Sequence, residues 1–139
     1  MTKPCFFCDV QQQDDLQRIA ESEFCFSRYD DFPVSKGHAE IVSKRHIESV
    51  FDLTAGEFTD VQTLLQKSKA VIDEEYSPDG YTVGINVGEA GGQTIPHMHM
   101  HVIPRYNGDV TEPNGGVRNI LKKGDYSDQA KTAGKEKYL

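Results

Sequence analysis

The alternation of apolar and polar positions divides the first half of the chain into short extended segments. Residues 18–28 (RIAESEFCFSR) and 38–44 (HAEIVSK) are rich in β-branched and aromatic residues. Polar pairs interrupt these segments, and the sequence DDFPVSKG separates them. Short strands joined by turns have this composition, so we expect a small antiparallel meander.

A different spacing follows in the middle of the chain. Thr54 and Glu57 form the pattern of a capping box, in which the hydroxyl and the carboxylate bind free amide groups at a helix start. Apolar residues then recur at roughly helical spacing: Phe58, Val61, Leu65, Ile72 and Tyr76. This spacing predicts one helix that packs one face on the sheet and ends at Ser-Pro-Asp-Gly, residues 77–80.

The second half returns to extended segments. YTVGINV (81–87) and PHMHMHVIPRY (96–106) have the composition of strands, and the glycine-rich sequence GEAGGQT (88–94) joins them. The resulting order is β-β-β-α-β-β. This order predicts an α+β fold, with an antiparallel sheet of about five strands and one long helix.

Length and composition fit a single domain. A chain of 139 residues with 37% hydrophobic residues can fill one core and is too small for two. We therefore expect one domain over residues 1–139, with its core in residues 1–106. From Asn107 onward the chain is polar and has little to bury, so residues 107–139 are expected to form a partly extended segment.

Charge and hydropathy exclude several classes of partner. The formal net charge of -7 disfavours nucleic acid and anionic membranes, because both require a dominant basic field. No run approaches the ~20 apolar residues of a membrane span. The first ten residues, MTKPCFFCDV, lack the apolar stretch of a signal peptide. We expect a cytoplasmic protein.

Three of the five histidines occupy alternate positions in one predicted strand. Strand residues alternate faces, so His97, His99 and His101 share one face and the apolar residues between them point to the core or helix. An exposed polar strand edge is one interpretation. A single zinc ion held by all three is another, but the outer two Cα atoms would lie ~13 Å apart. The third divides the work among a metal ligand, a nucleophile and a phosphate-binding group.

Two neighbouring motifs carry further candidate chemistry. Cys5 and Cys8 form C-x-x-C, which supplies two thiolates for a metal or a redox pair. A thioredoxin-like pair would be expected in a βαβ unit, which the pattern does not contain. In the loop of residues 88–94, glycines allow backbone amides to approach an anion, although such a loop is also typical of a simple turn. Gln93 and Thr94 add polar side chains there.

These motifs together resemble the histidine triad (HIT) superfamily of nucleotide hydrolases and transferases. The sequence HMHMHVI (97–103) matches the H-φ-H-φ-H-φ-φ signature, with GGQT before it. KGHAEIVSKRH (36–46) matches an upstream family segment, and the C-x-x-C matches the zinc-containing members. The resemblance implies a HIT-like fold, reaction at the α-phosphate of a nucleotide, and a homodimer with a two-fold axis.

The resemblance also implies roles for individual residues. His99 takes the position of the nucleophile, which forms a covalent nucleotidyl-histidine that water then hydrolyses. His101 takes the position that hydrogen-bonds the phosphate or leaving group, and His38 the position that orients the nucleophile. The positions implied to bind the nucleotide are Phe6, Phe7, Asp30, Asn86, Gln93, Thr94, His99 and His101. The positions implied to hold one structural zinc ion are Cys5, Cys8, His46 and His97.

The segment after the triad indicates a branch of the superfamily. PRYNGD (104–109) resembles the Fhit-like branch, which hydrolyses dinucleoside polyphosphates such as diadenosine tri- and tetraphosphate. Basic residues could then bind the polyphosphate: Arg105, Arg118, Lys122 and Lys123. The cysteine pair instead resembles the branch that hydrolyses nucleoside phosphoramidates. A nucleotide-binding or scaffolding protein with little turnover is a third possibility. Cys25 has no role in any of these interpretations.

Overall fold

The structure is a computed structural model that describes residues 4–121. The chain divides into two units between Tyr106 and Asn107. In the second unit, the described residues include one short 3-10 helix, Gly116–Asn119. Residues 122–139, which include Lys122, Lys123 and much of the predicted C-terminal segment, lie outside the described residues.

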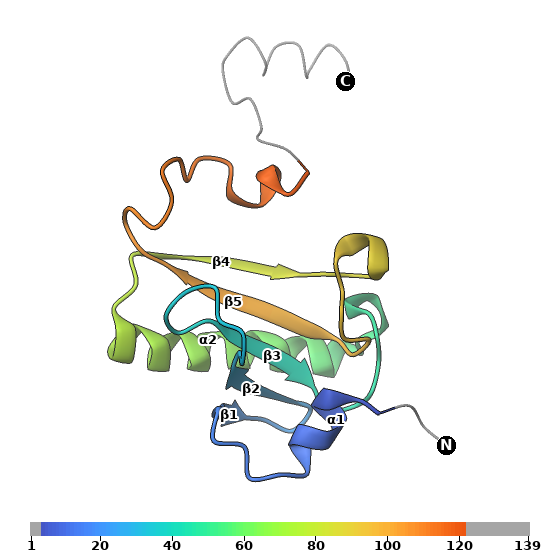
Figure 1. The fold of residues 1–139 in the computed structure, drawn as a ribbon. Helices are drawn as coiled ribbons and strands as arrows, with labels where there is room; N and C mark the ends of the chain where they lie inside the picture. Colours follow the sequence, from blue (N-terminus) through green and yellow to red (C-terminus); the bar gives the residue numbers. More distant parts are fainter. Residues whose placement is uncertain (1–3, 122–139) are drawn as a thin grey trace. The chain divides into compact units, whose positions relative to one another are not determined.

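A five-stranded sheet forms the centre of the first unit (Figure 1). Its strands are β1 (Arg18–Glu21), β2 (Cys25–Tyr29), β3 (Ala39–Ser43), β4 (Gly80–Ile85) and β5 (His99–Arg105). Their order across the sheet is β1-β2-β3-β5-β4, and every neighbouring pair is antiparallel. The predicted α+β fold, with its meander and five strands, is confirmed.

The long helix α2 (Ala55–Tyr76) begins at the predicted capping box. The Thr54 hydroxyl accepts a hydrogen bond from the Glu57 N–H, and the Glu57 carboxylate accepts one from the Thr54 N–H. The helix ends at Ser77, whose backbone is left-handed with φ 50°. The predicted helix and both of its ends are confirmed.

The face of α2 that packs on the sheet differs from the predicted one. Phe58 was expected to be buried, but 58% of its surface is exposed. The buried residues of the helix are Glu57, Val61, Leu64, Ser68 and Ile72. The buried positions are centred on Ser68 and Phe58 lies outside them, so the buried face is rotated relative to the predicted apolar stripe.

Several short elements were not predicted. They are the helix α1 (Phe6–Gln11) and the 3-10 helices Val50–Asp52 and Glu89–Gly91. Helix α1 is six residues long and its N-cap residue, Cys5, makes no side-chain cap, so it carries no sequence signal. Strand β5 starts three residues later than predicted because the His97 N–H bonds back to the Ile95 carbonyl, which forms a turn.

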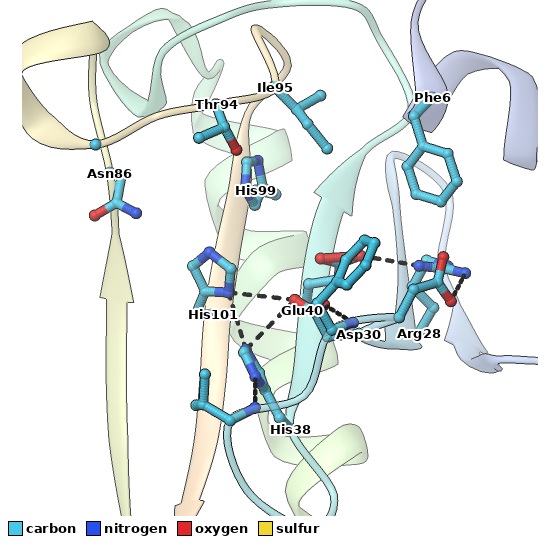
Figure 2. Close-up of a pocket in the computed structure, with 14 residues that line it drawn as sticks. Phe6, Arg28, Asp30, His38, Glu40, Asn86, Thr94, Ile95, His99 and His101 are labelled. Atoms are coloured by element: carbon cyan, nitrogen blue, oxygen red, sulfur yellow. Dashed lines mark hydrogen bonds and ion pairs between the residues drawn. The ribbon is translucent and has the colours of Figure 1, made fainter.

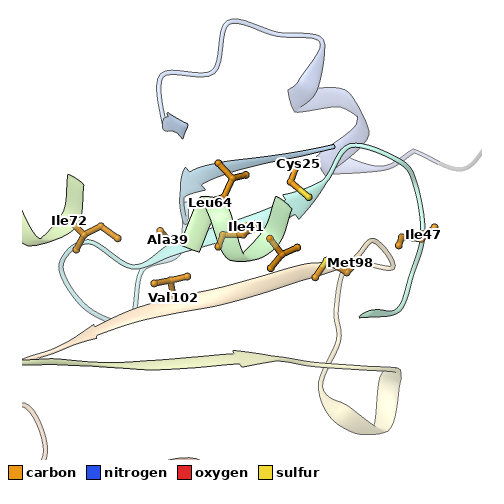
Figure 3. Packing of buried hydrophobic residues seen from close by; sticks show 9 residues of the cluster. Cys25, Ala39, Ile41, Ile47, Leu64, Ile72, Met98 and Val102 are labelled. Carbon is orange, nitrogen blue, oxygen red and sulfur yellow. The ribbon is translucent and has the colours of Figure 1, made fainter. Parts of the chain in front are cut away.

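Two apolar clusters cover the two faces of the sheet. The larger lies between the sheet and α2 and includes Ile41, Leu64, Met98 and Val102 (Figure 3). The smaller packs α1 on the opposite face, through Phe7, Val10, Phe26 and Val42. The second cluster lies on the same face as His99, because Val42 is paired with His99 across β3 and β5. In the described residues, no helix is both long and apolar enough to cross a membrane.

Candidate active site

The histidines of β5 line a pocket of about 360 Å³ on the sheet face opposite α2 (Figure 2). The strand alternation expected from the sequence places His99 and His101 on this face, and Met98 and Val102 are buried in the core beneath α2. The residues that line the pocket are Phe6, Arg28, Asp30, Asp31, Phe32, Val34, His38, Glu40, Asn86, Gly92, Thr94, Ile95, His99 and His101.

His99 is the candidate nucleophile, and its tautomer follows from its surroundings. The ring is 7% exposed, and Nδ1 lies 2.8 Å from the backbone carbonyl oxygen of His97. A carbonyl oxygen only accepts hydrogen bonds, so Nδ1 carries the proton and donates it. In the neutral ring, Nε2 therefore keeps its lone pair, as a nitrogen that attacks phosphorus must.

His101, the histidine that follows His99 on β5, is joined to His38 by a hydrogen bond. The Val34 N–H donates to His38 Nδ1 over 3.1 Å, so the proton of the neutral His38 ring is on Nε2. That Nε2–H donates to Nδ1 of His101, 3.0 Å away. His101 in turn must carry its proton on Nε2, which makes it a hydrogen-bond donor for a ligand.

The neutral state of these two rings follows from their burial. Burial lowers the pKa of His38, and the nearby Asp30 carboxylate opposes this only in part. Burial, together with the two neighbouring histidine rings, also lowers the pKa of His101. Asp30 Oδ2 lies 3.5 Å from His38 Nε2 and 3.7 Å from His101 Nδ1. At neutral pH both histidine rings are thus uncharged. The Asp30 carboxylate can stabilise a proton that arrives on them during a reaction.

The two cysteines of the C-x-x-C motif meet His46 and His97 just before the start of β5. His97 Nδ1 lies 3.4 Å from Cys5 Sγ, 3.6 Å from Cys8 Sγ and 3.1 Å from His46 Nδ1. Cys8 Sγ lies 3.3 Å from His46 Nδ1. These four donor atoms all lie within 4.8 Å of one another.

This donor set fits a tetrahedral metal ion. Ligands at zinc-like bond lengths of ~2.0–2.3 Å stand about 3.3–3.8 Å apart along the edges of a tetrahedron, close to the distances between these atoms. His97 Nε2 lies 2.6 Å from the Ser43 carbonyl oxygen and must donate to it, so its Nδ1 lone pair faces the cluster. Burial and the hydrogen bond with Cys5 raise the pKa of Cys8 to about 11, and a divalent cation would favour the thiolate instead.

Asp30, His38 and His101 form a second group with donor atoms this close. In this group, the positions of the histidine protons disfavour the binding of a metal ion. The Val34 N–H occupies Nδ1 of His38, so the Nε2 atom that faces the other two residues carries a proton and offers no lone pair. This group is a hydrogen-bonded chain within the pocket.

The structure brings most of the sequence-derived candidates together. Phe6, Asp30, Asn86 and Thr94 line the pocket with the histidines. Phe7 was expected to line it too, but its side chain is fully buried, with ring centroids 5.6 Å from His97 and 4.9 Å from His99. Phe7 therefore packs against the two histidine rings and is not part of the pocket wall.

Gln93 also lies outside the pocket wall. Its carbonyl oxygen accepts from the Gly88 N–H, and its amide donates to the carbonyl oxygens of Glu48 and Ile95. These three bonds fix the glycine-rich loop, so the side chain holds the loop that carries Thr94. Among the basic residues, Arg105 donates to the Thr82 hydroxyl over 3.1 Å, and Arg118 belongs to the second unit.

The sequence reasoning missed two buried charged residues in the pocket. Arg28 and Glu40 are opposite one another on β2 and β3, and are 2% and 4% exposed. The available signal was the period of two in β3, which places Glu40 on the same face as His38. Cys25, which had no predicted role, is buried in the core beneath α2.

Comparisons with known proteins agree with this arrangement. The model of the HIT domain family matches residues 11–108. A bis(5'-adenosyl)-triphosphatase of Dictyostelium discoideum is 37% identical over 102 residues, which cover 73% of this chain and 68% of that protein. An asymmetrical bis(5'-nucleosyl)-tetraphosphatase of Schizosaccharomyces pombe is 37% identical over 93 residues, 67% of this chain and 50% of that protein. The chain thus spans about half the length of the second relative.

Solved structures give the same result. A HIT family protein from Bacillus subtilis superposes with a TM-score of 0.72 at 29% identity, covering 99% of this chain and 98% of that one. A hypothetical histidine triad nucleotide-binding protein from Sulfolobus tokodaii gives a TM-score of 0.69 at 27% identity, covering 75% of this chain and 70% of that one.

Proposed function

The chain belongs to the HIT domain family, and from that premise we propose that it hydrolyses dinucleoside polyphosphates at the α-phosphate. Relatives named as a bis(5'-adenosyl)-triphosphatase and a bis(5'-nucleosyl)-tetraphosphatase support this substrate class. The observation that carries the proposal is the His99 ring, whose Nδ1–H is fixed on the His97 carbonyl while Nε2 is left as a nucleophile.

The reaction proceeds in two steps. His99 Nε2 attacks the α-phosphorus, a nitrogen–phosphorus bond forms, and the bond to the bridging oxygen breaks, which releases the other nucleotide. The ring then carries a positive charge, which its Nδ1–H shares with the His97 carbonyl oxygen. Water then attacks the same phosphorus and loses a proton to solvent, the nitrogen–phosphorus bond breaks, and a nucleoside monophosphate is released from the neutral ring.

The other pocket residues hold the reacting groups. The Nε2–H of His101 is a donor for a phosphate oxygen or for the departing oxygen, and the bond from His38 keeps that proton on Nε2. Asp30 accepts hydrogen bonds from ribose hydroxyls. Asn86 and Thr94, which flank the histidines in Figure 2, donate to phosphate.

We also propose one structural zinc ion, held by Cys5, Cys8, His46 and His97. The four donor atoms and their spacing support this site. A bound zinc ion would tie the N-terminal segment to the start of β5 and fix the backbone carbonyl of His97, which accepts the proton of His99. It takes no part in the reaction steps.

The compartment and the oligomeric state complete the proposal. None of the three cysteines forms a disulfide, which suits a reducing compartment, and we place the protein in the cytoplasm. We further propose a two-fold homodimer, since Phe58 on α2 and Val83 on the edge strand β4 leave apolar surface exposed.

Hydrolysis of nucleoside phosphoramidates is the second candidate function. The observation that favours it is the cysteine pair of the metal cluster, which resembles that branch of the superfamily. A panel of diadenosine triphosphate, diadenosine tetraphosphate and an AMP amine conjugate separates the two, with AMP release followed by chromatography. Faster release from the dinucleotides supports the main proposal, and faster release from the conjugate supports the alternative.

The His99→Ala variant tests the covalent mechanism. Loss of the nucleophile should reduce turnover of the preferred substrate by at least about 10³-fold, while AMP still binds in calorimetry. All five histidines lie in the pocket or in the proposed zinc site, so the control is Leu16→Ala, a change at a residue that is 93% exposed and outside both. Turnover by His99→Ala at the wild-type rate would overturn the mechanism. Binding without turnover by the wild-type protein would instead indicate a nucleotide-binding protein.

A further inference from the structure

The pocket contains a buried ion pair that the proposed reaction does not use. With the α-phosphorus at His99 and the ribose at Asp30, the base extends into the remaining half of the pocket. Figure 2 shows Phe6 and Arg28 in that half, away from the histidines, and Glu40 between Arg28 and His101. The inference drawn here rests on the proposed function, because it concerns the base of the same nucleotide.

Arg28 is anchored by three carboxylates. Its Nε donates to Asp15 over 2.8 Å, Nη2 donates to Asp31 over 3.2 Å and to Asp15 over 3.4 Å, and Nη1 donates to Glu40 over 3.1 Å. These contacts use four of the five guanidinium N–H groups, as far as the described residues are concerned. The second N–H of Nη1 is left beside the Glu40 carboxylate.

Glu40 is the charged group that this arrangement presents to the pocket. It is 4% exposed, lines the pocket and is paired with His101 across β3 and β5. A carboxyl group buried at this depth is costly unless it is paired, and only its Oε2 atom bonds to Arg28. The Arg28–Glu40 pair thus presents two things to a ligand: the lone pairs of the Glu40 carboxylate and one N–H donor of Arg28.

The aromatic residues in this half do not distinguish between bases. Phe6 and Phe32 both line the pocket, with 42% and 87% of their surfaces exposed. Stacking on an aromatic ring tolerates any base, since every base has a π face. Selection among bases must therefore come from the polar pair.

We propose that Glu40, oriented by Arg28, binds the hydrogen-bonding edge of the base and makes the site prefer guanine to adenine. Guanine presents two adjacent N–H donors, N1–H and the 2-amino group, which match the two oxygens of one carboxylate. Its O6 acceptor lies beside them and matches the second N–H of Nη1. Adenine has an acceptor at N1, which a carboxylate repels, so one of the buried oxygens is left unpaired.

The protonation of Glu40 gives this preference a pH dependence. Burial, and then the Asp30 carboxylate, outweigh the attraction of Arg28 and raise the pKa of Glu40 to about 8. The groups that face it are Arg28 from β2, Asp30 from the turn after β2, and His101 from β5. An acid ionises above its pKa, so the carboxylate form and the preference for guanine should increase from pH 6.5 to pH 9.

The test compares diguanosine and diadenosine triphosphate as substrates of the wild-type protein. At pH 9, where Glu40 is mostly ionised, we expect kcat/KM to be about 10-fold or more higher for the guanine substrate. In Glu40→Leu the ratio should fall to about 1, because the side chain then neither binds the N–H groups of guanine nor repels N1 of adenine. In Glu40→Gln the ratio should fall and lose its dependence on pH. Both variants keep Arg28 paired with Asp15 and Asp31, which preserves the fold.

Glu48→Gln is the matched control, because Glu48 is a carboxyl outside the pocket wall, and its ratio should equal that of the wild type. An equal or adenine-directed preference in the wild type, or an unchanged ratio in Glu40→Leu, would overturn the inference. If neither substrate were hydrolysed, the proposed function would fail separately. Calorimetry with GMP and AMP would then measure the same preference as a ratio of Kd values, again with Glu40→Leu.

Discussion

At the scale of the residue, backbone carbonyls decide which nitrogen each histidine presents. The Ser43 carbonyl takes the Nε2–H of His97, so Nδ1 faces the cysteines. The His97 carbonyl takes the Nδ1–H of His99, so Nε2 is left for the pocket. The two histidines thus have different roles, because a carbonyl binds Nε2 in His97 and Nδ1 in His99. The alternation of the sequence alone gives the shared face but not this division.

The Cys5→Ala variant tests the zinc proposal. Freshly purified wild-type protein should contain about one zinc ion per chain by elemental analysis, and Cys5→Ala should lose most of it because three donors hold the ion less tightly. Cys25→Ala is the control, since Cys25 is buried in the core and should not affect the metal content. A metal-free wild-type protein, or a Cys5→Ala variant with full zinc content, would exclude the site.

Some residues of the pocket could not be predicted from the sequence. The catalytic and metal-binding candidates were found because histidine and cysteine are uncommon and their spacing is specific. Arg28 and Glu40 are common charged residues in short strands, where a solvated surface is the usual expectation. Their burial depends on Asp15, which comes from a loop before β1 and pairs with Arg28 at 2.8 Å. No local sequence pattern predicts that Asp15 pairs with Arg28.

At the scale of the element, the start of α2 depends on a single group of polar contacts. Glu57 accepts from the Thr54 N–H at 2.9 Å and from Arg45 Nη2 at 2.8 Å. The bond from Arg45, assisted by those from Thr54, lowers the pKa of Glu57 to about 2 despite its burial. Its ionised form therefore stabilises the fold above pH 4.5, and that stability is lost as the pH falls toward about 2.

Two variants separate the neutral and charged parts of this cap. Thr54→Ala should lower the free energy of unfolding by about 1 kcal/mol in urea titrations at both pH 7 and pH 3.5, because the hydroxyl does not titrate. Glu57→Gln should cost more at pH 7 than at pH 3.5. A cost for Glu57→Gln that is the same at the two values would show that the charge of Glu57 contributes nothing.

Other elements were predictable only in part, for physical reasons that differ. The strands and α2 carry periodic patterns, and the structure has them. Helix α1 is stabilised by Phe7 and Val10 in a small cluster with Phe26 and Val42, contacts that are distant in sequence. Phe58 fits the helical spacing but lies outside the buried face, because the direction from which the sheet covers a helix is a tertiary property.

At the scale of the whole molecule, the sheet is covered unevenly. Helix α2 packs mainly across β1, β2 and β3, as Figure 1 illustrates. In the described part of the chain, β4 has only β5 as a neighbour, so its outer edge is unpaired. Val83 of this strand is 38% exposed, and Phe58 is 58% exposed. Exposed apolar side chains on α2 and on an open strand edge suit contact with a second copy of the chain around a two-fold axis.

This surface predicts how the oligomeric state responds to charge. The wild-type protein should sediment as a dimer at micromolar concentration, and Val83→Lys and Phe58→Glu should each shift it toward the monomer, because each places a charge in an apolar interface. Leu16→Glu is the matched control: Leu16 is 93% exposed and precedes β1 at the opposite edge of the sheet, so its variant should remain dimeric. Circular dichroism verifies that the variants are folded. A monomeric wild type would contradict the dimer, and a dimer that tolerates both charges would place its interface on another surface.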